Sequence, residues 1–226
     1  MSKTKNRNYP RTMINKNDIR QMLLARDVAI VGFGAVPQDI EMLKLSKRFP
    51  RAVVFGYNLS AGVMETIEDH PTLIYKHHYK TVNWLLDQTA FHLAAFIEAA
   101  GHRALAIPAS QTVDWKNQKG HISHKKLGRE AGVGWIGRSG LLVHPRYGAR
   151  VRYASVLTDW EFESDPVITT DCGSCRKCIA VCPAGAISET GVDLDKCRLT
   201  LTEFSRRPGI GQYICGVCVK ACNGQH

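Results

Sequence analysis

Residues 171–187, DCGSCRKCIAVCPAGAI, place four cysteines within eleven residues and a proline directly after the last one. The spacing from Cys172 to Pro183 is C-x2-C-x2-C-x3-C-P. Three thiolates at this spacing can bind three corners of one [4Fe–4S] cubane, and the fourth cysteine of such a run ligates the other cluster when two are present. The segment therefore predicts iron–sulfur chemistry.

The other four cysteines follow a related pattern. Cys197 precedes the run Cys215-x2-Cys218-x3-Cys222, so both runs end in C-x2-C-x3-C and form an internal pseudo-repeat. We predict crossed ligation that uses all eight thiolates and brings two clusters close enough for electron transfer. The first set is Cys172, Cys175, Cys178 and Cys222, and the second set is Cys182, Cys197, Cys215 and Cys218. Locally, the pattern resembles bacterial two-cluster ferredoxins.

Zinc and disulfide bonds are the alternatives for these cysteines. Pairs of C-x2-C also suit tetrahedral zinc. A secreted disulfide-rich protein would spread its cysteines and carry a signal peptide, whereas the first 171 residues here have no cysteine and residues 1–18 have no apolar segment. The C-x2-C-x2-C row and its proline favour iron–sulfur clusters over both alternatives.

Composition and charge divide the chain further. Its 226 residues are 44% hydrophobic and 22% charged, which is typical of a globular protein, and no stretch is apolar enough to span a membrane. The net charge of +10 is compatible with a polyanionic partner. We predict a basic arm at 1–16, an α/β (α+β) domain at 17–165, and a double-cluster domain at 166–226.

The residues before the cysteines alternate between helical and strand patterns. Helices are predicted at 17–26, 38–49 and 79–101, and strands near 27–36, 51–58 and 103–110. This alternation favours a layered α/β architecture. The sequence VGFGAV lacks the full G-x-G-x-x-G pattern, so its glycines are interpreted as turn residues rather than as a nucleotide loop. Residues 140–145 and 149–160 are predicted to pair as strands around a turn at 146–148.

The stretch AGVGWIGRSGLLVHPRYGARVRYASVLTD (131–159), together with the two cysteine runs, resembles the epoxyqueuosine reductase family. That family is grouped with the reductive dehalogenases among cobalamin- and iron–sulfur-containing proteins. The resemblance implies a nitroreductase-like domain for cobalamin, with the clusters passing electrons to its cobalt. It implies a substrate in the form of epoxyqueuosine in a tRNA anticodon loop. The expected cofactor-binding residues are Gly134, Trp135, Ile136, Gly137, Arg138 and Tyr153.

Two departures from the family pattern shape these expectations. His124-Lys125 stands where family members often have an acidic residue followed by Arg. The chain also stops four residues after Cys222, whereas the family continues into a helical-repeat domain. We therefore expect a shortened relative, whose substrate can differ.

Three titratable residues are candidate proton donors: Asp114, His121 and His124. The alternatives are a turn or capping role for Asp114 and ordinary surface or hydrogen-bonded histidines. Trp135 and Tyr153 could stack on a cofactor or simply belong to the core.

The preferred function is a cytoplasmic iron–sulfur oxidoreductase that receives electrons from a ferredoxin- or flavodoxin-type donor. One alternative is an electron carrier or activase that reduces a partner corrinoid protein. Another is an RNA-binding protein, with tRNA as partner, in which the clusters are structural.

Overall fold

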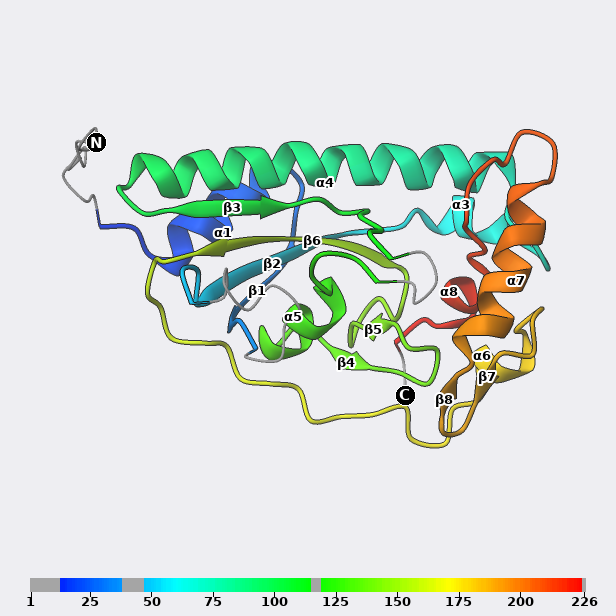
Figure 1. Cartoon of the computed structure of the whole chain (residues 1–226). Helices are drawn as coiled ribbons and strands as arrows, with labels where there is room; N and C mark the ends of the chain where they lie inside the picture. Colours follow the sequence, from blue (N-terminus) through cyan, green and yellow to red (C-terminus); the bar gives the residue numbers. More distant parts are fainter. Residues whose placement is uncertain (1–12, 38–46, 115–118, 225–226) are drawn as a thin grey trace.

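The computed structural model describes residues 13–37, 47–114 and 119–224 (Figure 1). Most of the predicted N-terminal arm and most of the predicted helix at 38–49 lie outside these ranges.

A four-stranded sheet forms the centre of the fold. Its strands are β1 (Ile30–Ala35), β2 (Arg51–Asn58), β3 (Ala104–Ile107) and β6 (Val151–Thr158). Their order is β1-β2-β6-β3, and each neighbouring pair is antiparallel. The central strands β2 and β6 are short apolar runs rich in β-branched residues, and both are buried along most of their length. The predicted mixed class of helices and sheet is confirmed, and the antiparallel pairing makes it an α+β arrangement.

Helix α4 (Leu73–Ala99) runs along one face of the sheet (Figure 1). It begins at Leu73 because the Thr72 side chain accepts a hydrogen bond from the backbone N–H of Tyr75 at 3.1 Å, which caps the first turn. The helix predicted at 79–101 forms the larger part of α4, and its apolar face packs on the sheet, although Phe96 is 36% exposed. Its fully or nearly fully buried members are Val82, Leu86, Ala90, Leu93 and Ile97. No helix in the described ranges, α4 included, combines the length and apolar character needed to cross a membrane.

Shorter elements complete the two layers. Helix α1 (Lys16–Leu24) begins with a capping box between Asn15 and Asp18 and lies on the α4 side. Helix α5 (His124–Glu130) packs on the opposite face of the sheet. This second face holds a separate hydrophobic cluster that includes Leu127, Leu142 and Tyr153.

The predicted pairing of residues 140–145 with 149–160 is wrong. Strand β5 (Leu142–Val143) instead pairs with β4 (Trp135–Ile136) in a two-stranded sheet of its own. Between β5 and β6, the backbones of His144 and Gly148 exchange hydrogen bonds of 2.9 and 2.8 Å. That closed turn redirects the chain, so β6 pairs with β2 and β3 instead.

The cysteine-rich segment is built from short elements. They are α6 (Lys177–Ala180), β7 (Ile187–Ser188), β8 (Gly191–Val192), α7 (Leu194–Ser205) and α8 (Val217–Ala221). Helix α3 (Ala61–Glu65) lies beside this segment. These gather at one end of the sheet in Figure 1. Ile210, Ile214 and Val217 are buried in the same hydrophobic cluster as the sheet and α4. One core therefore extends across the predicted boundary at residue 165, while the division into two domains stays a prediction.

We expect Ile214→Ala to lower the free energy of unfolding of the whole protein by about 2–4 kcal/mol, because it opens a cavity in this shared core. The control is Leu199→Ala on α7, where the side chain is 61% exposed and the loss should stay within about 0.5 kcal/mol. Urea unfolding measures both. Equal losses for the two variants would contradict a shared core.

Candidate iron–sulfur centre

Tight turns place the first cysteines of the motif. Gly173 adopts a positive φ of 48°, and its N–H donates to the Asp171 carboxylate at 2.6 Å. The Cys175 N–H then donates to the Cys172 carbonyl at 3.0 Å. These turns lead into α6, which carries Cys178, so three thiols are brought to one side of a short loop and helix.

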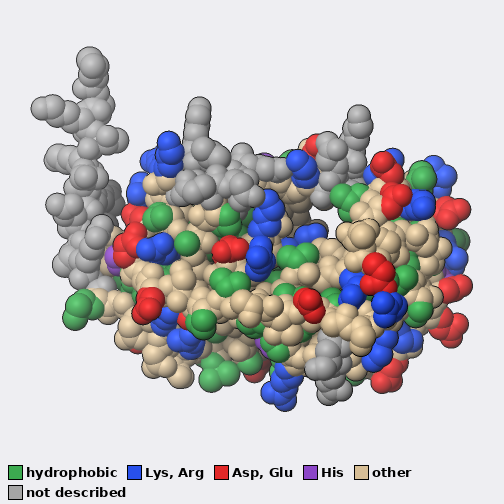
Figure 2. All heavy atoms as spheres, turned by 90° about the horizontal axis from the view of Figure 1, so that it is seen from below, with side chains coloured by type: hydrophobic (Ala, Val, Ile, Leu, Met, Phe, Trp, Pro, Cys, Tyr) green, Lys and Arg blue, Asp and Glu red, His purple; other side chains and the backbone are tan. Residues whose placement is uncertain are grey.

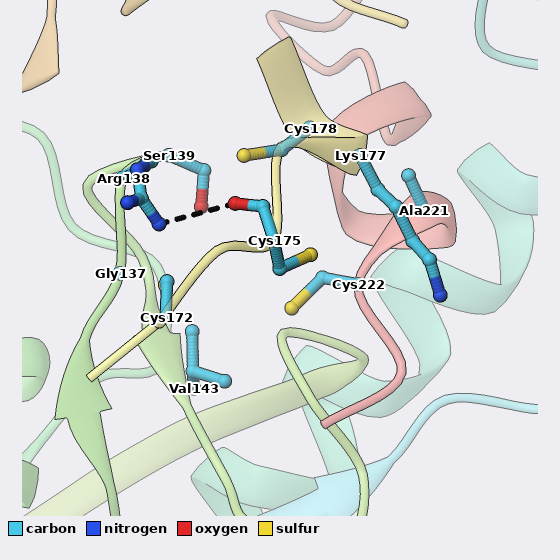
Figure 3. A pocket seen from close by; sticks show the side chains of 10 residues that line it. All are labelled: Gly137, Arg138, Ser139, Val143, Cys172, Cys175, Lys177, Cys178, Ala221 and Cys222. Carbon is cyan, nitrogen blue, oxygen red and sulfur yellow. Dashed lines mark hydrogen bonds between the residues drawn. The ribbon is translucent and has the colours of Figure 1, made fainter. Parts of the chain in front are cut away.

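Cys222, the last cysteine of the chain, joins these three thiols. One pocket is lined by Cys172, Cys175, Cys178 and Cys222, together with Gly137, Arg138, Ser139, Val143, Lys177 and Ala221 (Figure 3). The four cysteines are the predicted first set. The fold thus brings Cys222 to the three cysteines with which the spacing grouped it, while their assignment as cluster ligands stays a prediction.

The electrostatics of the thiols separate the same two sets. Burial raises the pKa of Cys178, and the thiolates of Cys172, Cys222 and Cys175 raise it further. In the second set, burial raises the pKa of Cys215 to about 11, with contributions from Cys197 and Cys182.

Cys218 connects the two sets. Burial raises its pKa to about 12, and Cys215, Cys197, Cys182 and finally Cys178 of the first set add to the shift. The thiols of Cys178 and Cys218 are therefore near enough to interact electrostatically, so the two sets are neighbours at these residues.

The chemistry of this donor set fits iron–sulfur clusters. All eight cysteines are free thiols and half-buried. Burial and mutual repulsion disfavour the thiolate form, so a bound cationic centre is what would keep these sulfurs deprotonated. Within residues 13–37, 47–114 and 119–224, no three Cys, His, Asp or Glu side chains are arranged around a single metal ion.

Arg138 holds the first cysteine loop in place. Its guanidinium donates to the carbonyls of Gly173 at 2.8 Å and Cys175 at 3.1 Å. It also pairs with Glu189 at 2.9 Å, and Glu189 pairs with Arg176 as well. Sequence reasoning proposed Arg138 for cofactor binding, and the structure places it beside the cysteine loop.

The turn before β6 packs against the backbone of Cys222. Gly148 has φ of 63°, and a Cβ there would lie 2.2 Å from the Cys222 carbonyl oxygen, so only glycine fits. Backbone hydrogen bonds from Ala149 and Gly224 partly offset the raised pKa of Cys222, whose largest cause is burial. Arg150 donates to the Lys220 carbonyl at 2.9 Å. The sequence did not predict this contact between the 148–150 turn and residues 220–222, because the two segments are about 70 residues apart and carry no local motif.

The other predicted cofactor-binding residues are largely engaged within the protein. A Cβ on Gly134 would lie 2.1 Å from the Val143 carbonyl oxygen, and one on Gly137 would lie 3.1 Å from the Cys172 sulfur. These glycines therefore permit close packing of protein on protein.

Of the three remaining predicted contacts, Trp135 and Tyr153 are buried, and Ile136 is 42% exposed. The Trp135 Nε1 and Tyr153 hydroxyl atoms have no hydrogen-bond partner in the described part of the chain. What these three residues could offer a corrinoid is therefore limited to the two unpartnered polar atoms and the exposed Ile136 side chain.

The three predicted proton donors are held in different ways. His124 hydrogen-bonds to Ser155 Oγ through Nδ1 at 2.9 Å and to the Pro108 carbonyl through Nε2 at 2.8 Å. Because a carbonyl only accepts, Nε2 carries the proton, and Ser155 donates to Nδ1. The backbone N–H of His121 donates to Gln111 Oε1 at 2.7 Å, and Asp114 forms an isolated antiparallel bridge with Lys119.

The geometry of His124 gives a pH dependence of stability. Burial lowers its pKa to about 4, with a smaller contribution from Arg152, while the hydrogen bond to Pro108 opposes the shift. The unfolded state binds this proton more readily, so stability is full above pH 6.5 and falls as the pH drops towards 4. The loss amounts to roughly 3 kcal/mol, at about 1.4 kcal/mol per unit. His124→Gln should flatten this part of the profile, measured by urea unfolding against pH. An unchanged profile would show that His124 is not the titrating group.

We also expect Cys222→Ala to lose one cluster, lowering bound iron from about eight to about four per chain. Ser139→Ala alters the same pocket without removing a thiol and is the matched control. Metal analysis of anaerobically purified protein measures both. Full iron content in the cysteine variant would remove Cys222 from the ligand set.

No family model matches the chain. The epoxyqueuosine reductase of Bacillus anthracis is 33% identical over 112 residues, which is 46% of this chain and 30% of that protein. The Gloeobacter violaceus enzyme of the same name is 29% identical over 199 residues, which is 82% of this chain and 59% of that protein. The chain thus spans less than two thirds of the length of these curated relatives, 30% of one and 59% of the other.

Solved structures share the fold. The catabolic reductive dehalogenase NpRdhA matches 90% of this chain and 31% of its own, with a TM-score of 0.72 and 20% identity. A selenomethionine-labelled epoxyqueuosine reductase matches 92% of this chain and 66% of its own, with a TM-score of 0.62 and 20% identity. The resemblance predicted from the sequence is confirmed: the chain is similar in sequence to proteins named epoxyqueuosine reductase and shares a fold with a solved epoxyqueuosine reductase and a reductive dehalogenase.

Proposed function

We propose that this protein is an iron–sulfur oxidoreductase of the epoxyqueuosine reductase type, which relays single electrons through two [4Fe–4S] clusters. The observation that carries the proposal is the meeting of Cys222 with Cys172, Cys175 and Cys178 in one pocket. Crossed ligation of this kind requires two clusters side by side. The approach of Cys178 to Cys218 supports a short path between them.

The surroundings of the two sets suggest a direction for the electrons. The first set lies against Gly137 and Val143 of the β4–β5 region, whereas the second set lies near Tyr75, whose raised pKa has Cys215 and Cys218 among its causes. We propose that a low-potential ferredoxin- or flavodoxin-type donor reduces the second cluster. The first cluster then serves the acceptor near β4 and β5.

The substrate proposal comes from the relatives. They are named epoxyqueuosine reductases, and one solved structure of this kind contains an epoxyqueuosine-modified tRNA stem loop. The face seen in Figure 2 carries Lys and Arg side chains interspersed with acidic ones, and it is hollowed near its middle. The net charge of +10 also suits a polyanion. We propose epoxyqueuosine in tRNA as the first substrate to test, with Asp114 and His121 as candidate proton donors.

A corrinoid is the acceptor that the fold suggests, since a similar reductive dehalogenase structure is described as B12-dependent. The residues expected to hold it are mostly engaged in internal contacts, as described above. This observation favours a second function, in which the clusters reduce a corrinoid held by a partner protein. His124 is the weakest candidate acid, because both of its ring nitrogens already have partners.

One experiment separates these functions. The protein is purified anaerobically, incubated with cobalamin and passed through gel filtration, and its iron and cobalt are measured. The proposed reductase predicts about eight irons and close to one retained cobalt per chain. The same iron without cobalt would support the electron carrier, and zinc in place of iron would refute both.

A further inference from the structure

Helix α4 exposes large apolar side chains on the face that points away from the sheet. Trp84 is 60% exposed, Phe91 is 66% exposed and Ile74 is 57% exposed. In Figure 1, α4 forms one border of the molecule, and no other helix or strand of the described chain is drawn beyond it. Trp and Phe are enriched in protein interfaces, where they bury much apolar area. This face of α4 therefore has the composition of a contact surface.

The exposed residues of this face recur at alternating intervals of three and four. They are Ile74, His77, Thr81, Trp84, Gln88, Phe91, Ala95 and Glu98, which we call the outer stripe. An average spacing of 3.5 residues is the pattern with which two helices pack along their length. The stripe extends over most of the 27 residues of α4, a helix about 40 Å long at 1.5 Å per residue. A second helix can therefore contact it over many turns.

The charged side chains of α4 are divided between its two halves. Both lysines, Lys76 and Lys80, precede Trp84, and both acidic residues, Asp87 and Glu98, follow it. The first turn of the helix has no acidic residue and the last turn has no basic one. This order opposes the helix macrodipole, which favours acids at the N-terminus and bases at the C-terminus. The charges of α4 are thus poorly placed for the helix alone, whereas an antiparallel neighbour of the same sequence sets the basic half against the acidic half.

We propose that the outer stripe is the interface of a two-fold symmetric homodimer, in which α4 packs antiparallel against α4 of a second copy of this chain. With the two-fold axis near the middle of α4, Trp84 lies opposite Phe91 of the second copy. Glu98 then lies opposite His77 of the second copy and within one helical turn of its Lys80. The same patch serves both copies, as a two-fold interface requires.

A second copy is the occupant that the charges select. A purely acidic or purely basic helix would complement only one half of α4, whereas a second α4 complements both halves. A parallel arrangement would place lysines against lysines and acids against acids, which costs free energy. None of the residues that line the four-cysteine pocket belongs to α4, so the inference does not depend on the proposed function.

The first test is sedimentation velocity of the anaerobically purified full chain over a range of concentrations. We expect a dimer that dissociates on dilution. Phe91→Glu places a charge in the apolar part of the interface and should raise the dimer Kd at least about tenfold. The matched control is Leu199→Glu on α7, where the replaced side chain is 61% exposed and lies outside the stripe, so the dimer Kd should stay unchanged. A wild-type monomer at every concentration, or a dimer that Phe91→Glu does not weaken, would overturn the proposal.

A charge exchange tests the antiparallel orientation. Lys80→Glu and Glu98→Lys should each weaken the dimer, because each change sets like charges against one another across the axis. The double variant Lys80→Glu with Glu98→Lys restores opposite charges in reversed order, so its dimer should be tighter than that of either single variant. Both side chains are exposed, and circular dichroism checks that each variant is folded. A double variant that dimerises no better than the weaker single variant would overturn the antiparallel pairing.

Discussion

The contact between Cys222 and the turn before β6 is the constraint on which the proposed site depends. It brings the end of the described chain against Gly148 and Arg150, at the start of the central strand. Without it, the first set of thiols would have three members and no link to the sheet. With it, the four thiols of the first set and Arg138 line one pocket, and the core is continuous from α4 to α8.

This arrangement gives the two halves of the chain different physical tasks. The antiparallel sheet and α4 form a rigid base whose buried apolar residues hold the cysteine segment through Ile210, Ile214 and Val217. The cysteine segment itself has short helices and many turns, so its order depends on that base, on the Arg138–Glu189 pair and on whatever the thiols bind. Raised thiol pKa values at Cys215 and Cys218 show how unfavourable the thiolates are without a cationic partner.

Periodicity predicted much of the fold, while the metal ligands taken from the cysteine spacing stay a prediction. The helix predicted at 79–101 makes up most of α4. Cysteine spacing grouped Cys222 with the distant Cys172 set, and these four cysteines line one pocket. The pairing of β5 with β4 was not predicted, because a short apolar run does not indicate which strand it pairs with. The turn at 144–148 also resembles a hairpin turn locally. The contacts of Arg138 with Glu189 and with the Gly173 carbonyl could not be predicted, because tertiary packing sets such contacts.

Crossed ligation of two cubanes can be tested by an anaerobic crystal structure with anomalous diffraction at the iron edge. We expect two four-iron peaks, with Cys222 bound to the same cluster as Cys172, Cys175 and Cys178. A Cys222 bound together with Cys215 and Cys218, or a single tetrahedral metal ion in either set, would contradict it.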